Sequence, residues 1–290
     1  MKVNRLMRIN DLLRTASEKL RRNGTENAGE EVEILFQHAG GPSKKDRIMN
    51  SVVYTDEKTA ESFVNLIDER LSGKPLQYIL GEWEFYGNLF YVGEGVLIPR
   101  AETEMLVDEA DAFLKNIRQA NVLDLCAGTG CVGITAALHN PLSTVYAVEK
   151  YDSSFRFLEK NVAKFNLKNV HPFKSDIFDG VAITDAEIRY DVLLSNPPYI
   201  ATDELKSLQK EVRFEPETAL DGGVDGLDFY RAIYELWLPA LKQGALVSLE
   251  CGEDNADKVA AVLSERCCDI EVKSDFNGLP RIVSAKYRGD

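Results

Sequence analysis

One stretch of the sequence decides the fold: Asn121-Val122-Leu123-Asp124-Leu125-Cys126-Ala127-Gly128-Thr129-Gly130-Cys131-Val132-Gly133. It predicts a buried strand that runs into a glycine-containing turn, followed by a helix over the apolar residues Ile134 to Leu138. Glycines in such a turn let a ligand approach the backbone, and the start of the helix offers N–H groups without intrahelical partners. A glycine turn alone is weak evidence of a binding site, so the neighbouring segments decide its meaning.

Two further predicted strands end in acidic residues. Thr144-Val145-Tyr146-Ala147-Val148 leads to Glu149, about 20 residues after the turn, a spacing at which a carboxylate can reach a ribose diol. Val170 to Lys174 leads to Ser175-Asp176-Ile177-Phe178, whose carboxylate can accept from an adenine amino group while the apolar residues cover the ring. The alternatives are a surface glutamate after an ordinary strand, and an aspartate that caps a helix.

A further apolar run, Tyr190 to Ser195, leads to Asn196-Pro197-Pro198-Tyr199. The run predicts a buried parallel strand, and two prolines stop it, which holds Asn196 at the carboxyl edge of the sheet. The side-chain oxygen of Asn196 and the carbonyl oxygen of Pro197 offer two acceptors that suit a planar NH2 group. Tyr199 offers a flat face for stacking a planar substrate. The alternative is that these four residues form only a rigid turn.

Together these residues resemble the class I S-adenosylmethionine-dependent methyltransferases, and Asn-Pro-Pro-Tyr narrows the resemblance to those that methylate a planar NH2 nitrogen. Four further segments resemble the HemK-type (PrmC-type) protein-(glutamine-N5) methyltransferases, which act on peptide chain release factors. These segments are Gly73-Lys74-Pro75-Leu76-Gln77-Tyr78-Ile79-Leu80-Gly81, Val96-Leu97-Ile98-Pro99-Arg100-Ala101-Glu102-Thr103-Glu104, Glu215-Pro216 through Asp221-Gly222-Gly223 to Arg231, and Asp275 through Gly278 to Arg281. The resemblance runs from about Leu71 to Arg281, and the residues before it match only in general helical character.

The resemblance implies an α/β fold of the Rossmann-like type, with a seven-stranded, mostly parallel sheet whose last strand is antiparallel. It also implies three parts: a helical substrate-recognition domain over residues 1–80, a β-hairpin linker over 81–99 and a methyltransferase domain over 100–290. The implied reaction moves a methyl group from S-adenosylmethionine to the glutamine of a Gly-Gly-Gln motif in class I release factors and leaves S-adenosylhomocysteine. Arg100 is expected to organise the loop around the cofactor.

The resemblance assigns roles to residues at the strand ends. The catalytic residues are Asn196, Pro197 and Tyr199, and the substrate-binding residues are Asn196, Pro197, Pro198 and Tyr199. The cofactor-binding residues are Cys126, Ala127, Gly128, Thr129, Gly130, Glu149, Asp176, Ile177 and Asn196. If Asn196 and Pro197 each accept one N–H of the substrate amide, the nitrogen lone pair points at the methyl group of the cofactor. No prior deprotonation and no general base are then needed.

Two positions depart from the family pattern. Members usually have glycine where this chain has Cys126, and proline where it has Ala101. A small thiol can pack in a tight turn, so we expect cofactor binding to survive. The missing proline slightly loosens the start of the next helix.

Composition limits the classes of partner. The chain has 290 residues, of which 44% are hydrophobic, and a formal net charge of −13. This acidity argues against nucleic acid as the main partner, because proteins that grip phosphates need clustered Lys and Arg. No apolar run is long enough to span a membrane and no signal-peptide core is present, so we expect a cytoplasmic enzyme without membrane contact. We also expect a monomer. The remaining alternatives are a nucleic-acid adenine or cytosine amino methyltransferase, a methyltransferase for a ribosomal protein glutamine, and a non-catalytic binding module.

The cysteines and histidines predict neither a metal site nor disulfides. The five cysteines, Cys126, Cys131, Cys251, Cys267 and Cys268, include no Cys-x-x-Cys pair. None of the three histidines, His38, His139 and His171, stands beside a cluster of metal ligands or a nucleophile. We therefore expect no metal cofactor.

Periodicity assigns the remaining elements. Apolar residues at helical spacing, such as Ile9 to Leu20 and Phe63 to Leu71, predict a small helical domain before residue 72. Glu84 to Val92 is aromatic-rich and contains Gly-Asn, which predicts a β-hairpin. From Glu102 onward, strands and helices alternate, as in a doubly wound sheet.

Overall fold

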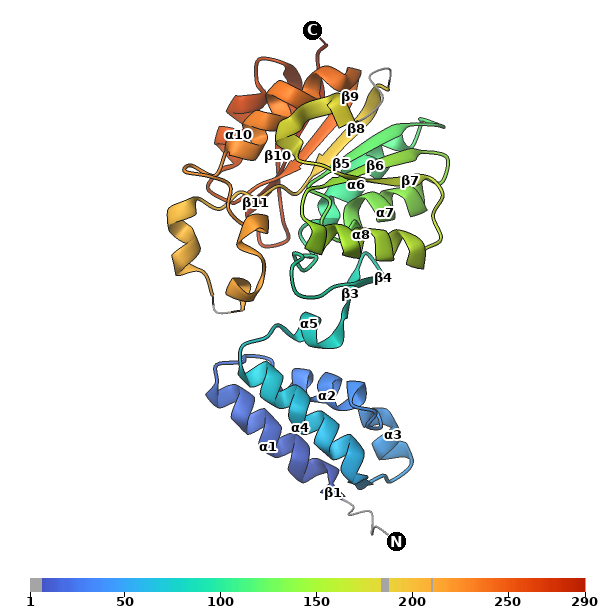
Figure 1. Cartoon of the computed structure of the whole chain (residues 1–290), viewed down its shortest axis with the longest axis vertical. Helices are drawn as coiled ribbons and strands as arrows, with labels where there is room; N and C mark the ends of the chain where they lie inside the picture. The colour runs from blue at the N-terminus through green and yellow to red at the C-terminus, as the bar shows by residue number, and fades with distance from the viewer. Residues whose placement is uncertain (1–6, 184–187, 210, 290) are drawn as a thin grey trace. The chain divides into compact units, whose positions relative to one another are not determined.

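The computed structural model describes residues 7–183, 188–209 and 211–289 (Figure 1). Its contacts divide the chain into two compact units. The first unit runs to Gly81 and also includes residues 211–214, and the second unit begins at Glu82 and contains the rest. The chain therefore leaves the second unit for a short segment and then returns to it.

The first unit is a helical bundle around a small apolar core. Ile9, Leu20, Phe36 and Phe63 are buried, and the rings of Phe36 and Phe63 meet edge to face with centroids 5.4 Å apart. The helical spacing of the sequence predicts these inward faces. The elements of the unit are β1 (Met7–Arg8), α1 (Ile9–Arg22), α2 (Ala28–His38), α3 (Lys44–Met49), β2 (Tyr54–Thr55), α4 (Glu57–Leu71) and α5 (Leu76–Leu80).

An ion cluster ties residues 211–214 to this bundle. The guanidinium of Arg70, on α4, is only 3% exposed, and its Nε donates to Glu31 on α2 at 2.6 Å. Its Nη2 also donates to Glu211. A buried guanidinium is costly without such partners, so the two carboxylates make its burial possible.

The second unit contains a seven-stranded sheet in the order β10-β11-β9-β8-β5-β6-β7 (Figure 1). The strands from β9 to β7 are parallel, and β11 runs antiparallel to both β9 and β10. This confirms the predicted mostly parallel sheet with an antiparallel final strand. The strands are β5 (Asn121–Leu125), β6 (Thr144–Glu149), β7 (Val170–Lys174), β8 (Tyr190–Ser195), β9 (Leu241–Glu250), β10 (Cys267–Ser274) and β11 (Pro280–Tyr287).

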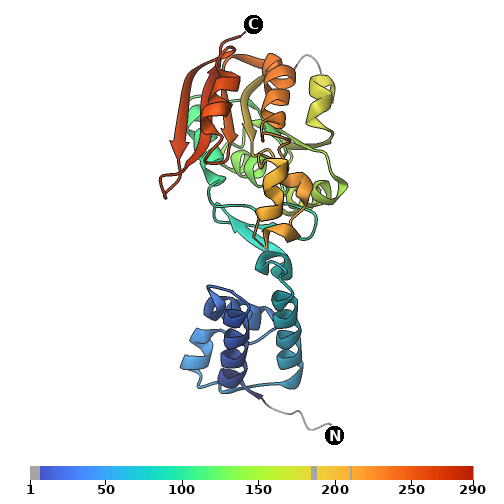
Figure 2. The same ribbon diagram turned by 90° about the vertical axis from the view of Figure 1, so that its left-hand side faces the viewer.

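Helices cover both faces of the sheet (Figure 2). Along β8, Leu193 belongs to one core with Tyr230 and Trp237, whereas Val192 belongs to the other core with Leu106. Strands buried on both faces are continuously apolar, which is why these runs could be recognised in the sequence. The covering elements are α6 (Glu104–Leu114), α7 (Cys131–His139), α8 (Asp152–Lys164), α9 (Asp228–Ala232), α10 (Ala256–Leu263), a π-helical turn (Ile233–Trp237) and the 3-10 segments Ile177–Ile183 and Leu238–Ala240. Two further 3-10 segments, Thr202–Ser207 and Glu217–Ala219, contribute no residue to either core.

The hairpin of β3 (Glu82–Phe85) and β4 (Asn88–Tyr91) belongs to the second unit. The Gly-Asn turn predicted for it is wrong by one residue, because Asn88 already lies in β4. The two central residues are Tyr86 and Gly87, with φ of 51° and 73°, the pattern that two-residue hairpin turns favour. A tyrosine accepts this backbone because its own N–H donates to Glu104 at 2.7 Å.

Candidate active site

The glycine turn after β5 forms one wall of a cavity at the carboxyl edge of the sheet. Three of its residues have positive φ: Cys126 at 58°, Gly128 at 56° and Gly130 at 78°. The family glycine that Cys126 replaces therefore stands at a left-handed position, which costs a non-glycine residue about 1–2 kcal/mol. Burial raises the pKa of the Cys126 thiol, which stays protonated.

Gly130 has a packing role, and it is absent from the residues that line the cavity. A Cβ on Gly130 would lie 2.4 Å from Cδ1 of Leu158, so the missing side chain lets α8 approach the turn. Gly128 differs, because the nearest atom to such a Cβ is 3.8 Å away. Gly128, Ala127, Thr129 and Cys126 do line the cavity.

Glu149, at the end of β6, holds the glycine turn in place. One carboxylate oxygen accepts the N–H of Gly128 and the other accepts the N–H of Tyr151, both at 2.9 Å. The side chain is buried, and this burial raises its pKa while the two N–H groups oppose the shift. Each oxygen keeps a lone pair for a further donor, so a ribose hydroxyl can still bind.

Asp176 and Ile177 lie beside Glu149 in the lining of the cavity. The carboxylate of Asp176 accepts the N–H of Phe178 at 3.1 Å and pairs with Lys150 at 2.6 Å. Ile177 is buried, and its carbonyl oxygen accepts from the indole of Trp237 at 2.8 Å. An adenine amino group bound to Asp176 would therefore share the carboxylate with Lys150.

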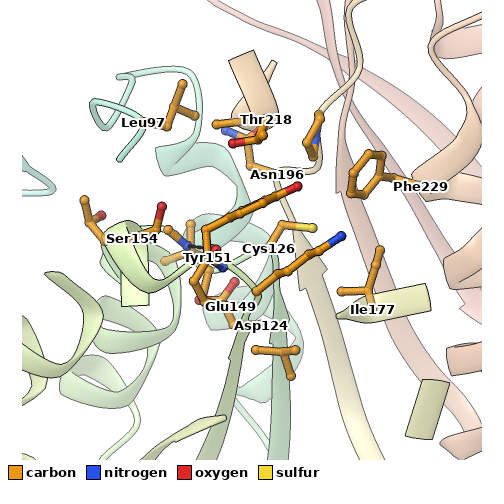
Figure 3. A pocket seen from close by; sticks show the side chains of 18 of the residues that line it. Leu97, Asp124, Cys126, Glu149, Tyr151, Ser154, Ile177, Asn196, Thr218 and Phe229 are labelled. Carbon is orange, nitrogen blue, oxygen red and sulfur yellow. Dashed lines mark hydrogen bonds between the residues drawn. The ribbon is translucent and has the colours of Figure 1, made fainter. Parts of the chain in front are cut away.

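Asn196 faces the glycine turn from the end of β8. Ser195 donates to the carbonyl of Leu125 at 2.8 Å, which keeps the ends of β8 and β5 together. The Asn196 Nδ2 donates to Thr103 Oγ1 at 3.1 Å, and Thr103 Oγ1 donates to Glu250 Oε2 at 2.6 Å. Figure 3 shows the side chains of Asn196, Cys126 and Glu149 around one cavity, each from the end of a different strand.

The residues after Asn196 have unequal places. Pro198 lines the cavity, whereas Pro197 and Tyr199 are not among its lining residues. The Tyr199 ring lies beside Gly252. The backbone carbonyl oxygen of Tyr199 accepts a hydrogen bond from Asn255 Nδ2 at 3.0 Å. Burial raises the pKa of the Tyr199 hydroxyl, which stays neutral. Its role as a stacking face for the substrate stays a prediction.

Two buried carboxyl groups flank the site. Asp124, on β5, lines the cavity and accepts the N–H of Gly133 at 2.9 Å, and burial raises its pKa to about 7. Burial also raises the pKa of Glu250 to about 7, against the hydrogen bond from Thr103 and the charges of Arg281 and Arg100. Both groups can therefore change charge near neutral pH.

Arg100 acts through a buried glutamate. Arg100 donates to Glu215, whose other oxygen accepts the N–H of Ile98 at 2.9 Å. These contacts fix the segment that brings Leu97 and Pro99 to the cavity. Arg100 itself is not among the lining residues.

Several lining residues escaped the sequence reasoning. Six of them stand inside family-like segments, which was the available signal: Leu97, Pro99 and Thr103 in Val96 to Glu104, and Thr218, Ala219 and Phe229 in Glu215 to Arg231. Phe178, expected to cover an adenine ring, lies in the lining. The lining residues not predicted for the site are Leu97, Pro99, Thr103, Asp124, Cys131, Val132, Val148, Lys150, Tyr151, Ser154, Thr218, Ala219 and Phe229.

Within residues 7–183, 188–209 and 211–289, no three His, Cys, Asp or Glu side chains are grouped to hold a metal ion. None of the helices in the described part of the chain has the length and apolar character that crossing a membrane requires.

Comparison with known families matches both parts of the chain. Residues 11–81 match the PrmC N-terminal domain and residues 102–215 match the methyltransferase small domain. A release factor glutamine methyltransferase of Fusobacterium nucleatum is 34% identical over 284 residues, covering 95% of this chain and 78% of the relative. Relatives with the same name from Geobacter sulfurreducens and Clostridium acetobutylicum are 35% and 33% identical, covering 92% and 98% of this chain and 92% and 100% of their own lengths.

Two solved structures share the fold over most of this chain. The hMettl16 catalytic domain in complex with MAT2A 3′UTR hairpin 1 has a TM-score of 0.56 at 15% identity, covering 80% of this chain and 81% of its own. The T. Thermophilus 16S rRNA N2 G1207 methyltransferase in complex with AdoMet and guanosine has a TM-score of 0.50 at 19% identity, covering 71% of this chain and 50% of its own. At these identities the likeness is one of fold, and it confirms the class I architecture.

Proposed function

The chain belongs to the release factor glutamine methyltransferase family, and we propose from this that it transfers the methyl group of S-adenosylmethionine to the amide nitrogen of a glutamine in peptide chain release factors. One observation identifies the atom that would contact the substrate amide. The Asn196 carboxamide lies in the same cavity as the glycine turn and Glu149, and its Nδ2 is engaged by Thr103. Its Oδ1 is therefore the atom left to accept from a substrate.

The chemistry of the cavity suits the proposed cofactor. Glu149 offers carboxylate lone pairs to a ribose, and Ile177, Phe178 and Phe229 offer apolar surface to an adenine. Gly128 leaves the backbone of the turn open to close approach. S-adenosylmethionine supplies a methyl group on a positively charged sulfur, which is the electrophile of the reaction.

The role of the protein follows from the weak nucleophilicity of an amide. The glutamine nitrogen shares its lone pair with its own carbonyl, so it must be oriented before it can attack. We assign this task to Asn196 Oδ1 and to the carbonyl oxygen of Pro197, which does not itself line the cavity but stands in the chain between the lining residues Asn196 and Pro198, each oxygen accepting one N–H of the NH2 group. The nitrogen then gives its lone pair to the methyl carbon as the carbon–sulfur bond breaks, with that electron pair remaining on sulfur. Fixed dipoles offset the positive charge that develops on nitrogen, whose proton passes to water afterwards.

The proposal extends to the partner and the compartment. The net charge of −13 supports a protein substrate over nucleic acid, since a polyanion would be repelled. We propose that the protein acts as a monomer in the cytoplasm, where release factors work. Size-exclusion chromatography with light scattering measures the mass, and a dimer would contradict the monomer.

Methyl transfer to purified release factor tests the function. Protein, release factor and S-adenosylmethionine with a labelled methyl group are mixed, and the methylated residue is identified by mass spectrometry. Label on the glutamine of the Gly-Gly-Gln motif is expected, with none on a release factor that carries glutamate there. Asn196→Ala removes one of two preorganised acceptors, so its single-turnover rate should fall by ~10²–10³. Label only on RNA or DNA, or a wild-type rate for Asn196→Ala, would contradict the proposal.

A further inference from the structure

Thr103 has an unusual hydrogen-bonding position for a threonine at the start of a helix. It is the N-cap residue of α6, where a threonine side chain commonly accepts an N–H of its own helix, yet it makes no such bond. Its hydroxyl instead lies between two groups of the second unit, Asn196 Nδ2 at 3.1 Å and Glu250 Oε2 at 2.6 Å. Thr103 and Glu250 are each only 2% exposed. Water therefore has little access to replace either bond.

When Glu250 is ionised, the protons of this chain of hydrogen bonds run in one direction. An ionised Glu250 can only accept, so the single hydroxyl proton of Thr103 goes to it. The Thr103 oxygen then has only lone pairs left for Asn196, which must present its NH2 group. Asn196 Oδ1 is consequently turned away from Thr103.

The direction matters because the two ends of a carboxamide are nearly equal in size. A rotation by half a turn would exchange Oδ1 and Nδ2 and set donor N–H groups against the N–H groups of the substrate. From this geometry, and resting on the proposed function, we infer that Thr103 is a positioning residue for methyl transfer: supported by Glu250, it holds the Asn196 carboxamide with its oxygen toward the substrate amide.

The test compares Thr103→Val with Thr103→Ser. Valine keeps the shape of threonine but can neither accept from Asn196 nor donate to Glu250, whereas serine keeps the hydroxyl. Single-turnover rates are measured on the release factor at pH 8, above the pKa of Glu250, which burial raises to about 7. Since one preorganised partner is worth ~10²–10³ in rate, Thr103→Val, which misplaces that partner without removing it, should lose about 10- to 100-fold. Thr103→Ser should stay within about threefold of wild type, because the polar contacts are kept.

A double mutant separates positioning from a general structural effect. If Thr103 acts through Asn196, Thr103→Val should add nothing to the loss already caused by Asn196→Ala. Full additivity would overturn the inference, and so would a wild-type rate for Thr103→Val. The affinity for S-adenosylmethionine, measured by calorimetry, should change less than about threefold, because the loss belongs to the reacting geometry. A loss confined to cofactor affinity would also overturn it.

Glu250→Gln tests the far end of the chain. Glutamine can either accept from Thr103 or donate to it, so the hydrogen bonds no longer have one enforced direction. The rate should fall by about twofold, because both orientations of the Asn196 carboxamide become accessible and only the one that turns Oδ1 toward the substrate supports transfer. An unchanged rate would remove Glu250 from the inference.

One readout is independent of activity. The side-chain NH2 signals of Asn196, assigned by their loss in Asn196→Ala, should exchange with solvent faster in Thr103→Val than in wild type and in Thr103→Ser. Equal exchange in all three would overturn the inference. A wild-type protein that transfers no methyl group to release factor, yet shows this difference, would contradict only the proposed function.

Discussion

Cys126 shows how a single residue can depart from a family pattern and keep its backbone conformation. Its φ of 58° belongs to the region that glycine enters freely and other residues enter at a cost. The side chain packs beside the sheet core, and its thiol stays protonated. The turn therefore keeps its left-handed geometry without the usual glycine, at the expense of local strain.

Substitutions at residue 126 should separate strain from packing. Cys126→Gly removes the cost of the left-handed backbone, about 1–2 kcal/mol. It also raises the conformational entropy of the unfolded chain and removes buried contacts, so the free energy of unfolding should change by less than about 1 kcal/mol. Cys126→Val puts a β-branched residue at positive φ and should lower the free energy of unfolding by about 2 kcal/mol or more. Urea unfolding measures both. A valine variant as stable as the glycine variant would show that the backbone is not strained.

Glu149 combines two tasks in one carboxylate, because it holds the turn and faces the cavity. Glu149→Ala should weaken binding of S-adenosylmethionine by about 1.5–3 kcal/mol, the range for hydrogen bonds to charged groups. Glu149→Gln keeps one acceptor oxygen and the size of the side chain, so it should lose less. Calorimetric titration compares the three proteins. Equal affinity for all would mean that this carboxylate does not contact the ribose.

At the scale of elements, parallel strands explain how much of the site could be predicted. The sites at the ends of β5, β6 and β8 follow apolar runs, and parallel strands bring their carboxyl ends to one edge. Thr103 and Phe229 could not be placed in this way, because they reach the edge from helices whose docking depends on tertiary packing. The hairpin turn was misplaced for a similar reason: contacts of Tyr86 with α6 override the local preference for Gly-Asn.

A pH effect belongs to β5. Burial raises the pKa of Asp124 from 3.8 to about 7. Between about pH 4 and pH 7, Asp124 is therefore ionised in the unfolded chain but protonated in the folded protein. The folded state binds more protons there, and the Asp124 contribution to stability must fall as pH rises from about 4 to about 7.

Asp124→Asn removes this titration and keeps an oxygen for the N–H of Gly133. Relative to wild type, the variant should gain about 2–4 kcal/mol in free energy of unfolding between pH 4 and pH 8. The other carboxyl groups, Glu250 included, are common to both proteins and cancel in the difference. Parallel dependence on pH in the two proteins would show that Asp124 ionises normally in the folded state.

At the scale of the whole molecule, the two units suggest a division of labour. All residues that line the cavity belong to the second unit. We propose that the first unit docks the release factor, because the glutamine alone offers little surface for recognition.

Removing residues 1–81 should therefore spare binding of S-adenosylmethionine and abolish methylation of intact release factor. A short peptide around the target glutamine, which needs no docking, should be methylated equally by truncated and full-length protein. Calorimetry measures cofactor affinity, and label incorporation measures transfer to each substrate. Normal methylation of intact release factor by the truncated protein would give the first unit another purpose.

The ion cluster around Arg70 has a consequence for how the protein is made. Glu31 leaves the ribosome before Arg70, but Glu211 follows only after β5, β6, β7 and β8 have been synthesised. While most of the parallel sheet is synthesised, the nascent bundle has only one of the two carboxylate partners of Arg70. Its final ion pair thus forms late in translation, and a ribosome stalled before codon 211 would carry a first unit that is not yet complete.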